Sequence, residues 1–235
     1  MIPAMLDPSG RVAMISGASR GIGRAILERL LEVGYTVSAG VRDVSSLPAR
    51  DGLSVHRYEA ESAELAAAWV AETVARHGRV DALVNAAGIN PKANFLDEDE
   101  EAHDAMWRVN VKAPMRLTRL AWPHLVAGGE GRVVNLASLS GKRVANDNTG
   151  YALSKFSVIA LTQAIRRQGW EHGIRATALC PGFVDTDMTS HVKHVDRAAM
   201  SRPEDLAALA ETVLRLPNTA TVGEVLVNWR LEPLL

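Results

Sequence analysis

The sequence predicts a single doubly wound α/β domain, with a parallel sheet of about seven strands and helices on both faces. Short apolar runs alternate with longer helical patterns along the whole chain, which is typical of βαβ units and a parallel sheet. The length of 235 residues fits one domain of this class, so we assign residues 1–235 to it. Hydrophobic residues make up 47% of the chain, enough to cover such a sheet.

The first half of the chain contains four expected strands and three expected helical regions. Strands are expected over residues 12–15, 36–39, 53–58 and 80–84, and helices over about 21–33, 63–76 and 97–126. Pro114 and Pro123 lie inside the last helical region, and we expect a kink or break at each. The segment 43–52 is too short and too interrupted by proline for a full crossover helix.

The second half of the chain continues the alternation. Strands are expected over residues 132–136, 174–179 and 225–227, and a helix over about 149–170. In parallel sheets of this kind, ligands bind beyond the carboxyl ends of the strands. The residues that follow each strand are therefore the candidates for a functional site.

Composition excludes several classes of function. A net charge of −1 gives no positive field that would attract nucleic acid or a membrane surface. No stretch approaches the roughly 18 to 20 apolar residues of a membrane helix, and Met1–Gly10 lacks the pattern of a signal peptide. Cys180 is the only cysteine, which excludes an intramolecular disulfide. We therefore expect a soluble, cytoplasmic protein that binds neither nucleic acid nor membranes.

A glycine-rich turn follows the first strand and opens the first helix. Gly17, Gly21 and Gly23 occupy a Gly-x-x-x-Gly-x-Gly spacing, and glycine allows positive φ and close approach of a ligand to the backbone. The helix that follows offers free N–H groups and the positive end of its dipole. The pattern predicts a pyrophosphate-binding turn, with a plain turn between strand and helix as the alternative.

Tyr151 and Lys155 lie four residues apart in an expected helix, so the phenol and the ammonium can share one face. A nearby cation lowers the pKa of a phenol, which lets a tyrosine exchange protons with an alcohol or an alkoxide. Ser138 follows an expected strand, and its hydroxyl is placed to hold a substrate oxygen. Alone, the Tyr–Lys pair is common in amphipathic helices; it gains meaning beside the glycine turn.

With these motifs in order, the chain resembles the short-chain dehydrogenase/reductase family from Arg11 to about Met188. The matching motifs are Ser16 with the glycine turn, Asn85-Ala86-Ala87-Gly88, Asn110, Ser138 with Tyr151 and Lys155, and Pro181 to Thr186. The resemblance implies a Rossmann-type fold and a nicotinamide cofactor. It also implies that Tyr151 is the acid/base, that Lys155 lowers its pKa and binds the ribose, that Ser138 orients the carbonyl, and that Asn110 holds a water.

The same resemblance implies a set of cofactor-binding residues spread over four loops. They are Gly17, Ser19, Arg20, Gly21, Ile22, Gly23, Arg42, Asn85, Ala86, Ala87, Gly88, Tyr151, Lys155, Pro181, Gly182, Val184 and Thr186. Where NAD-dependent members have an acidic residue after the second strand, this chain has Val41 followed by Arg42. An arginine there suits the 2′-phosphate, which favours NADP(H). Asp43 would favour NAD if the strand extends further.

The resemblance therefore implies an NADPH-dependent oxidoreductase, a carbonyl reductase or alcohol dehydrogenase acting on a small carbonyl or alcohol. The alternatives are a 3-oxoacyl-thioester reductase and a non-catalytic NADP(H)-sensing regulator. A homodimer or homotetramer is expected through the helices that contain Asn110 and Tyr151.

The substrate end of the site is the least regular part of the sequence. We expect a lid at about residues 182–202, whose histidines His191 and His194 face solvent rather than bind a metal. Asn90 and residues 146–148 are expected at the pocket mouth. After the last strand, Asn228-Trp229-Arg230 stands where many family members have a glycine-rich segment.

Overall fold

The computed structural model describes residues 5–231, so part of the Met1–Gly10 segment lies outside the described residues. The strands are β1 (Val12–Ser16), β2 (Thr36–Val41), β3 (Leu53–Arg57), β4 (Ala82–Asn85), β5 (Arg132–Leu136), β6 (Arg175–Pro181) and β7 (Glu224–Val227). The α-helices are α1 (Gly21–Glu32), α2 (Ala63–His77), α3 (Glu101–Met106), α4 (Ala113–Ala127), α5 (Thr149–Gly169) and α6 (Pro203–Arg215). Short helical segments are η1 (Val44–Ser46), η2 (Trp107–Lys112), η3 (Leu139–Gly141), η4 (Trp170–His172), η5 (Asp187–Thr189) and η6 (Arg197–Ala199).

The strands form one sheet in the order β3-β2-β1-β4-β5-β6-β7. Every pairing in it is parallel, which confirms the predicted fold class. The order reverses between β1 and β4, where Ser16 lies beside Asn85. Loops diverge to opposite faces at such a reversal and leave a crevice at the carboxyl ends of the strands, which is where doubly wound folds bind ligands.

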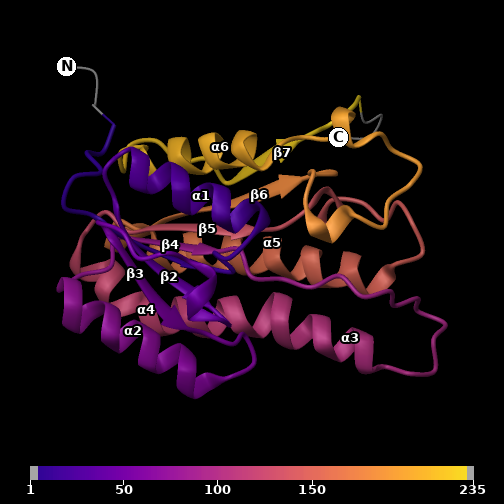
Figure 1. Cartoon of the computed structure of the whole chain (residues 1–235), viewed down its shortest axis with the longest axis horizontal. Helices are drawn as coiled ribbons and strands as arrows, with labels where there is room; N and C mark the ends of the chain where they lie inside the picture. Colours follow the sequence, from indigo (N-terminus) through magenta and orange to yellow (C-terminus); the bar gives the residue numbers. More distant parts are fainter. Residues whose placement is uncertain (1–4, 232–235) are drawn as a thin grey trace.

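Helices cover both faces of the sheet (Figure 1). On one face, α1 and α6 pack against strand residues such as Ile15 and Val84. On the other, α2, α4 and α5 pack against their strand neighbours Met14 and Leu83. Successive side chains of a strand point to opposite faces, so apolar strands buried on both sides form two separate cores.

Helix α6 is a difference from the sequence prediction, which contains no helix between the lid and the last strand. Leu206, Ala210 and Val213 recur at helical spacing and are buried on the α1 side of the sheet. Glu211 of α6 also accepts a hydrogen bond of 2.8 Å from Arg29 of α1. The spacing of the apolar residues and the proline at the helix start were the available signals.

The expected interruptions at the two prolines are confirmed only in part. The chain passes from the π-helical segment η2 into α4 just before Pro114, which occupies the first turn of α4. Because α4 continues directly from η2, where the Ala113 N–H still donates to the Arg108 carbonyl oxygen, Pro114 lacks an N–H within a continuous helical stretch, and the change from π-helical to α-helical hydrogen bonding falls at this junction. Pro123 lies inside α4, and the helix continues to Ala127 without a break, so that of the two expected outcomes only a kink stays a prediction. The loss of one hydrogen bond near a helix end is offset by burial of Ala121 and Leu125.

Candidate active site

A cleft of about 1180 Å³ opens at the carboxyl ends of the strands. It runs from the loop after β2, past the glycine turn, to the loops after β5, β6 and β7. The predicted site residues that line it are Gly17, Ser19, Arg20, Gly21, Ile22, Gly23, Arg42, Ala86, Ala87, Gly88, Ser138, Tyr151, Lys155, Pro181, Gly182, Val184 and Thr186. The structure thus brings residues from distant parts of the sequence to one crevice.

The glycine turn is packed too closely for a side chain at Gly17 or Gly23. Gly17 has a φ of +70°, and a Cβ there would lie 2.7 Å from the backbone nitrogen of Ala87. A Cβ on Gly23 would lie 2.3 Å from the carbonyl oxygen of Gly17. The loop after β4 is held against this turn because Ser16 Oγ accepts hydrogen bonds from the backbone N–H groups of Ala86 and Ala87. The two loops together form a floor made of backbone.

The N-terminus of α1 points free donors into this floor. Arg20 occupies the N-cap position without a capping side-chain hydrogen bond, so the first N–H groups of the helix are available to an external acceptor. Free N–H groups and the positive end of the dipole suit an anionic pyrophosphate. The residues present therefore fit the phosphate portion of a dinucleotide cofactor.

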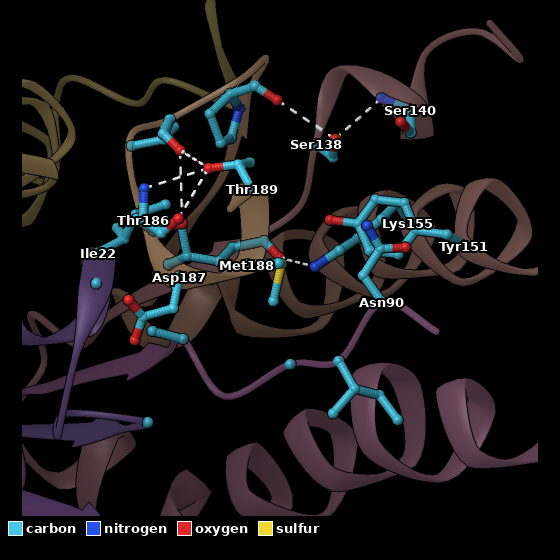
Figure 2. Close-up of a pocket in the computed structure, with 18 of the residues that line it drawn as sticks. Ile22, Asn90, Ser138, Ser140, Tyr151, Lys155, Thr186, Asp187, Met188 and Thr189 are labelled. Carbon is cyan, nitrogen blue, oxygen red and sulfur yellow. Dashed lines mark hydrogen bonds between the residues drawn. The ribbon is translucent and has the colours of Figure 1, made fainter. Parts of the chain in front are cut away.

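Tyr151, Lys155 and Ser138 converge at the other end of the cleft. Figure 2 shows Tyr151 and Lys155 projecting from α5 on one side and Ile22 and Thr186 on the opposite side. The Nζ atom of Lys155 lies 5.5 Å from the centroid of the Tyr151 ring and donates a 2.7 Å hydrogen bond to the carbonyl oxygen of Leu136. Ser138 Oγ donates to the carbonyl oxygen of Pro181 at 3.3 Å and accepts from the backbone N–H of Ser140 at 3.1 Å, and it lies close enough to the Tyr151 phenol to lower its pKa.

Burial dominates the electrostatics of this group. It raises the pKa of Tyr151 to about 12, with the Ser138 hydrogen bond as an opposing influence, and it lowers the pKa of Lys155 to about 8. The lowering of the Tyr151 pKa by Lys155 that the sequence predicts is not present in this arrangement. The ammonium group is directed to the Leu136 carbonyl, and desolvation of the phenolate outweighs the attraction of a cation at this distance.

Asn110 lies behind the cleft rather than on its lining. It belongs to η2, is 3% exposed, and accepts a 2.9 Å hydrogen bond from the Ile89 backbone N–H through Oδ1. Its Nδ2 donates to the Ile89 carbonyl oxygen and to Ser154 Oγ of α5. The side chain therefore holds the loop after β4 to the helix that contains Tyr151. The predicted role of holding a water stays a prediction.

Asn85 differs in position from the other residues of the predicted cofactor set. Its side chain points into the core and not into the cleft, with Nδ2 donating to Asn135 Oδ1 at 2.8 Å and to Thr118 Oγ1 at 3.3 Å. Asn135 in turn donates to Thr162 Oγ1 of α5 at 2.9 Å. The side-chain alternation of β4 turns Asn85 toward the α4 and α5 face, whereas the next residues, Ala86 and Ala87, border the cleft.

The two candidate determinants of cofactor choice differ in position. Arg42, directly after β2, is exposed and lines the cleft. Asp43 does not line it: its carboxylate caps η1 and accepts hydrogen bonds from the backbone N–H and hydroxyl of Ser45. The hydrogen bonds of Ser45 lower the pKa of this carboxyl group. Arg20 lines the cleft and forms an exposed ion pair with Asp187 at 3.3 Å.

The pocket mouth contains the predicted asparagines, and two of them bond each other. Asn148 Nδ2 donates to Asn90 Oδ1 at 2.8 Å, and both residues line the cleft with Asn146. His191 and His194 are exposed on the cleft wall. Within residues 5–231, no group of three or more metal-ligating side chains is found.

The sequence prediction missed several lining residues at both ends of the cleft. Tyr58 and Glu59, directly after β3, line one end, and the rule that ligands gather at carboxyl ends of strands was the available signal. Trp229 lines the other end, beside Phe183 of the expected lid. In the sequence Trp229 is only a departure from the family pattern, and no spacing places it in the site.

Fold and site together define an oxidoreductase domain of the Rossmann type, with a backbone cradle for a dinucleotide and a tyrosine, a lysine and a serine beside it. The chain belongs to the short chain dehydrogenase family, whose model matches residues 11–196. No helix among residues 5–231 is long and apolar enough to span a membrane.

Individual relatives agree with this assignment. The chain is 40% identical over 217 residues to an agropine synthesis reductase of Rhizobium rhizogenes; the match covers 90% of this chain and 50% of that protein. The chain thus spans about half the length of this relative. A metagenomic short-chain oxidoreductase solved in complex with NADP is 30% identical, with a TM-score of 0.81 over 96% of this chain and all (100%) of that one.

A 3-ketoacyl-(acyl-carrier-protein) reductase from Brucella melitensis, solved with NADH, has a TM-score of 0.87 at 27% identity. That match covers 94% of this chain and 98% of the other. The two solved structures therefore share the fold of this chain while they contain different nicotinamide cofactors.

Proposed function

We propose that this chain is an NADPH-dependent carbonyl reductase, or in reverse an alcohol dehydrogenase, with Tyr151 as its acid/base. The observation that supports this most directly is the meeting of the Tyr151 phenol, the Ser138 hydroxyl and the Lys155 ammonium in the same cleft as the glycine turn. A protein that only sensed NADP(H) would need the turn but not these three groups.

The proposed chemistry divides between cofactor and protein. The bound nicotinamide would supply or accept the hydride at the carbonyl carbon. Tyr151 would donate its proton to the oxygen that gains negative charge, and Ser138 would donate a hydrogen bond to the same oxygen. The raised pKa of Tyr151 keeps the phenol protonated at neutral pH, as donation to an incoming alkoxide requires.

Lys155 has two proposed tasks. From the wall formed by α5, its ammonium group would bind the ribose hydroxyls of the cofactor, and its charge would stabilise the phenolate left after proton transfer. Its lowered pKa of about 8 leaves most of the population charged at pH 7. A positive charge in a buried site acts more strongly than one in water because the effective dielectric constant is lower.

The preference for NADPH rests on the positions of Arg42 and Asp43. Arg42 lines the cleft after β2, where a planar guanidinium can bind a 2′-phosphate in a bidentate manner. Asp43, the residue that would favour NAD, is turned away and bound to Ser45. The neighbour solved with NADP agrees with this preference, and the one solved with NADH gives the alternative to be tested.

Three further proposals follow from the family. The substrate would be a small carbonyl compound or alcohol, with 3-oxoacyl thioesters as the second candidate class because of the solved 3-ketoacyl reductase neighbour. Residues 182–202 would form a lid over it. Two or four copies of the chain would associate through the helical stretch α3–η2–α4, which contains Asn110, and through α5, which contains Tyr151.

The first experiment follows the absorbance of NADPH, and separately of NADH, with purified protein and a panel of aldehydes, ketones, keto esters and 3-oxoacyl thioesters. Oxidation of NADPH that depends on a panel member, and is faster than with NADH, is the expected result. Tight NADPH binding without turnover on any carbonyl would refute the reductase and favour a sensor.

A further inference from the structure

The segment that follows the edge strand β7 reaches back over the catalytic end of the cleft. Gly182 donates a 2.9 Å backbone hydrogen bond to Val227, the last residue of β7. Trp229 and Arg230 follow two and three residues later and both line the cleft. The loop after β6 and the segment after β7 are thus joined by their backbones at the place where the substrate would enter.

The indole of Trp229 packs on the backbone beside the catalytic serine. A Cβ added to Gly182 would lie 2.7 Å from Cδ1 of Trp229 and 3.2 Å from Cδ1 of Leu139. Leu139 directly follows Ser138, and Pro181, which precedes Gly182, accepts the Ser138 hydrogen bond. The indole therefore lies beside the backbone that positions the Ser138 hydroxyl.

Trp229 is also part of a row of rings that continues into the predicted lid. The Phe183 and Trp229 ring centroids are 5.7 Å apart with an interplanar angle of 48°. Phe183 and His194 are 6.0 Å apart in an edge-on arrangement. These are favourable distances for aromatic pairs. The Arg230 guanidinium lies 4.8 Å from the indole centroid, a cation–π distance that restrains the ring.

We propose that Trp229 is a specificity-determining residue, whose indole forms with Phe183 an aromatic wall that selects carbonyl compounds bearing a planar, apolar group. The inference rests on the proposed reductase function and names its substrate class. An aryl ring can stack on or meet the edge of this wall, whereas a flexible alkyl chain of equal carbon number gains less contact and loses more conformational freedom.

The test compares two tryptophans of similar surroundings. Trp229 lines the cleft, with the Arg230 guanidinium over its ring. The centroid of the Trp170 ring lies 3.9 Å from the Arg175 guanidinium carbon, but Trp170 does not line the cleft. We would measure kcat/KM with NADPH for acetophenone and for octan-2-one, which contain equal numbers of carbon atoms. The variants are Trp229→Ala, the more conservative Trp229→Phe, and Trp170→Ala as the matched control.

The wild type is expected to prefer the aryl ketone, and Trp229→Ala to lose roughly 10- to 100-fold in kcat/KM on it, the range typical of a lost apolar contact in a pocket. The loss on the alkyl ketone should be at least several-fold smaller. Trp229→Phe should retain part of the preference, and Trp170→Ala should retain all of it. An unchanged ratio between the ketones in Trp229→Ala, or a wild type that prefers octan-2-one, would overturn the proposal.

A second readout separates this inference from the reductase itself. NADPH should quench the tryptophan emission of Trp170→Phe as strongly as that of the wild type and the emission of Trp229→Phe less strongly, because only Trp229 of this pair lines the cleft. If no carbonyl is reduced by the wild type, the proposed function fails. Equal quenching in the two phenylalanine variants would place Trp229 away from the cofactor and refute its role independently.

Discussion

Replacing Lys155 with methionine should stabilise the protein at neutral pH even as it removes activity. The Lys155 side chain is buried, and desolvation lowers its pKa from 10.5 to about 8. Each pKa unit corresponds to ~1.4 kcal/mol, so at pH 7 the charged amine makes folding less favourable by about 3 kcal/mol. Loss of the hydrogen bond to Leu136 destabilises the variant by about 1 kcal/mol. The free energy of unfolding of the variant should therefore be higher than that of the wild type by about 2 kcal/mol.

The pH dependence of this gain identifies its cause. The folded pKa of Lys155 is lower than the unfolded one. Between about pH 8 and pH 10.5 the unfolded chain therefore binds a proton that the folded chain has released, and the wild type gains stability as the pH rises. Below this window both states are protonated and the full cost is present. The advantage of the methionine variant should consequently be largest at pH 7 and disappear by about pH 10.5.

The assay is urea unfolding followed by circular dichroism at a series of pH values, with wild type and variant compared at each pH. Titration of other buried groups, such as Tyr58 with its pKa raised to about 12 by burial, is common to both proteins and cancels in the difference. Lys112→Met, at an exposed position, is the control and should show no pH-dependent difference. A Lys155→Met variant that is less stable than wild type by the same amount at every pH would refute the reasoning.

Three more predictions concern cofactor and catalysis. Tyr151→Phe should bind NADPH normally and lose at least roughly 10²-fold in turnover, the scale of general acid catalysis. The Ser138 hydroxyl keeps its hydrogen bond to the Pro181 carbonyl oxygen in this variant. Near-normal rates in single-turnover kinetics would contradict the role of Tyr151 as acid/base. Arg42→Ala should weaken the affinity for NADPH by roughly 10- to 100-fold, the scale of a charge-assisted hydrogen bond, and leave the affinity for NADH nearly unchanged. Equal losses of affinity for the two cofactors in fluorescence titrations would show that Arg42 does not contact the 2′-phosphate. Gly23→Ala should abolish binding of both cofactors, because its Cβ would lie 2.3 Å from the Gly17 carbonyl oxygen; calorimetric titration with measurable affinity would contradict the tight packing of this turn.

The architecture was predictable because it depends on pattern. Apolar runs separated by helical periodicity specify a covered parallel sheet whatever the individual residues are, and the observed sheet confirms it. The glycine turn was predictable for a related reason, since the positive φ of Gly17 and the contact at Gly23 admit no side chain. Both features follow from local chemistry that is readable along the chain.

The parts that were not predicted depend on three-dimensional surroundings. Asn85 ends a strand as expected, but its side chain enters the core, and the direction of one residue at a strand end is not fixed by a motif. The pKa of Tyr151 is raised by burial, which outweighs the opposing influence of the Ser138 hydroxyl, and burial was not visible in the spacing of Tyr151 and Lys155. Trp229 reaches the site only through the pairing of β7 with β6.

The buried hydrogen bonds from Asn85 to Asn135 and from Asn135 to Thr162 have a consequence for strand register. If a strand slipped by two residues, its apolar side chains would still face the correct layers, but Asn85, Asn135 and Thr162 would lose one another, and each stranded amide costs about 1–3 kcal/mol. These hydrogen bonds therefore favour one register of β4 and β5 and one position of α5 against them. Tyr151 lies about three turns before Thr162 on the same helix. The hydrogen bonds that disfavour a shifted strand register therefore also fix the position of the Tyr151 phenol relative to the sheet.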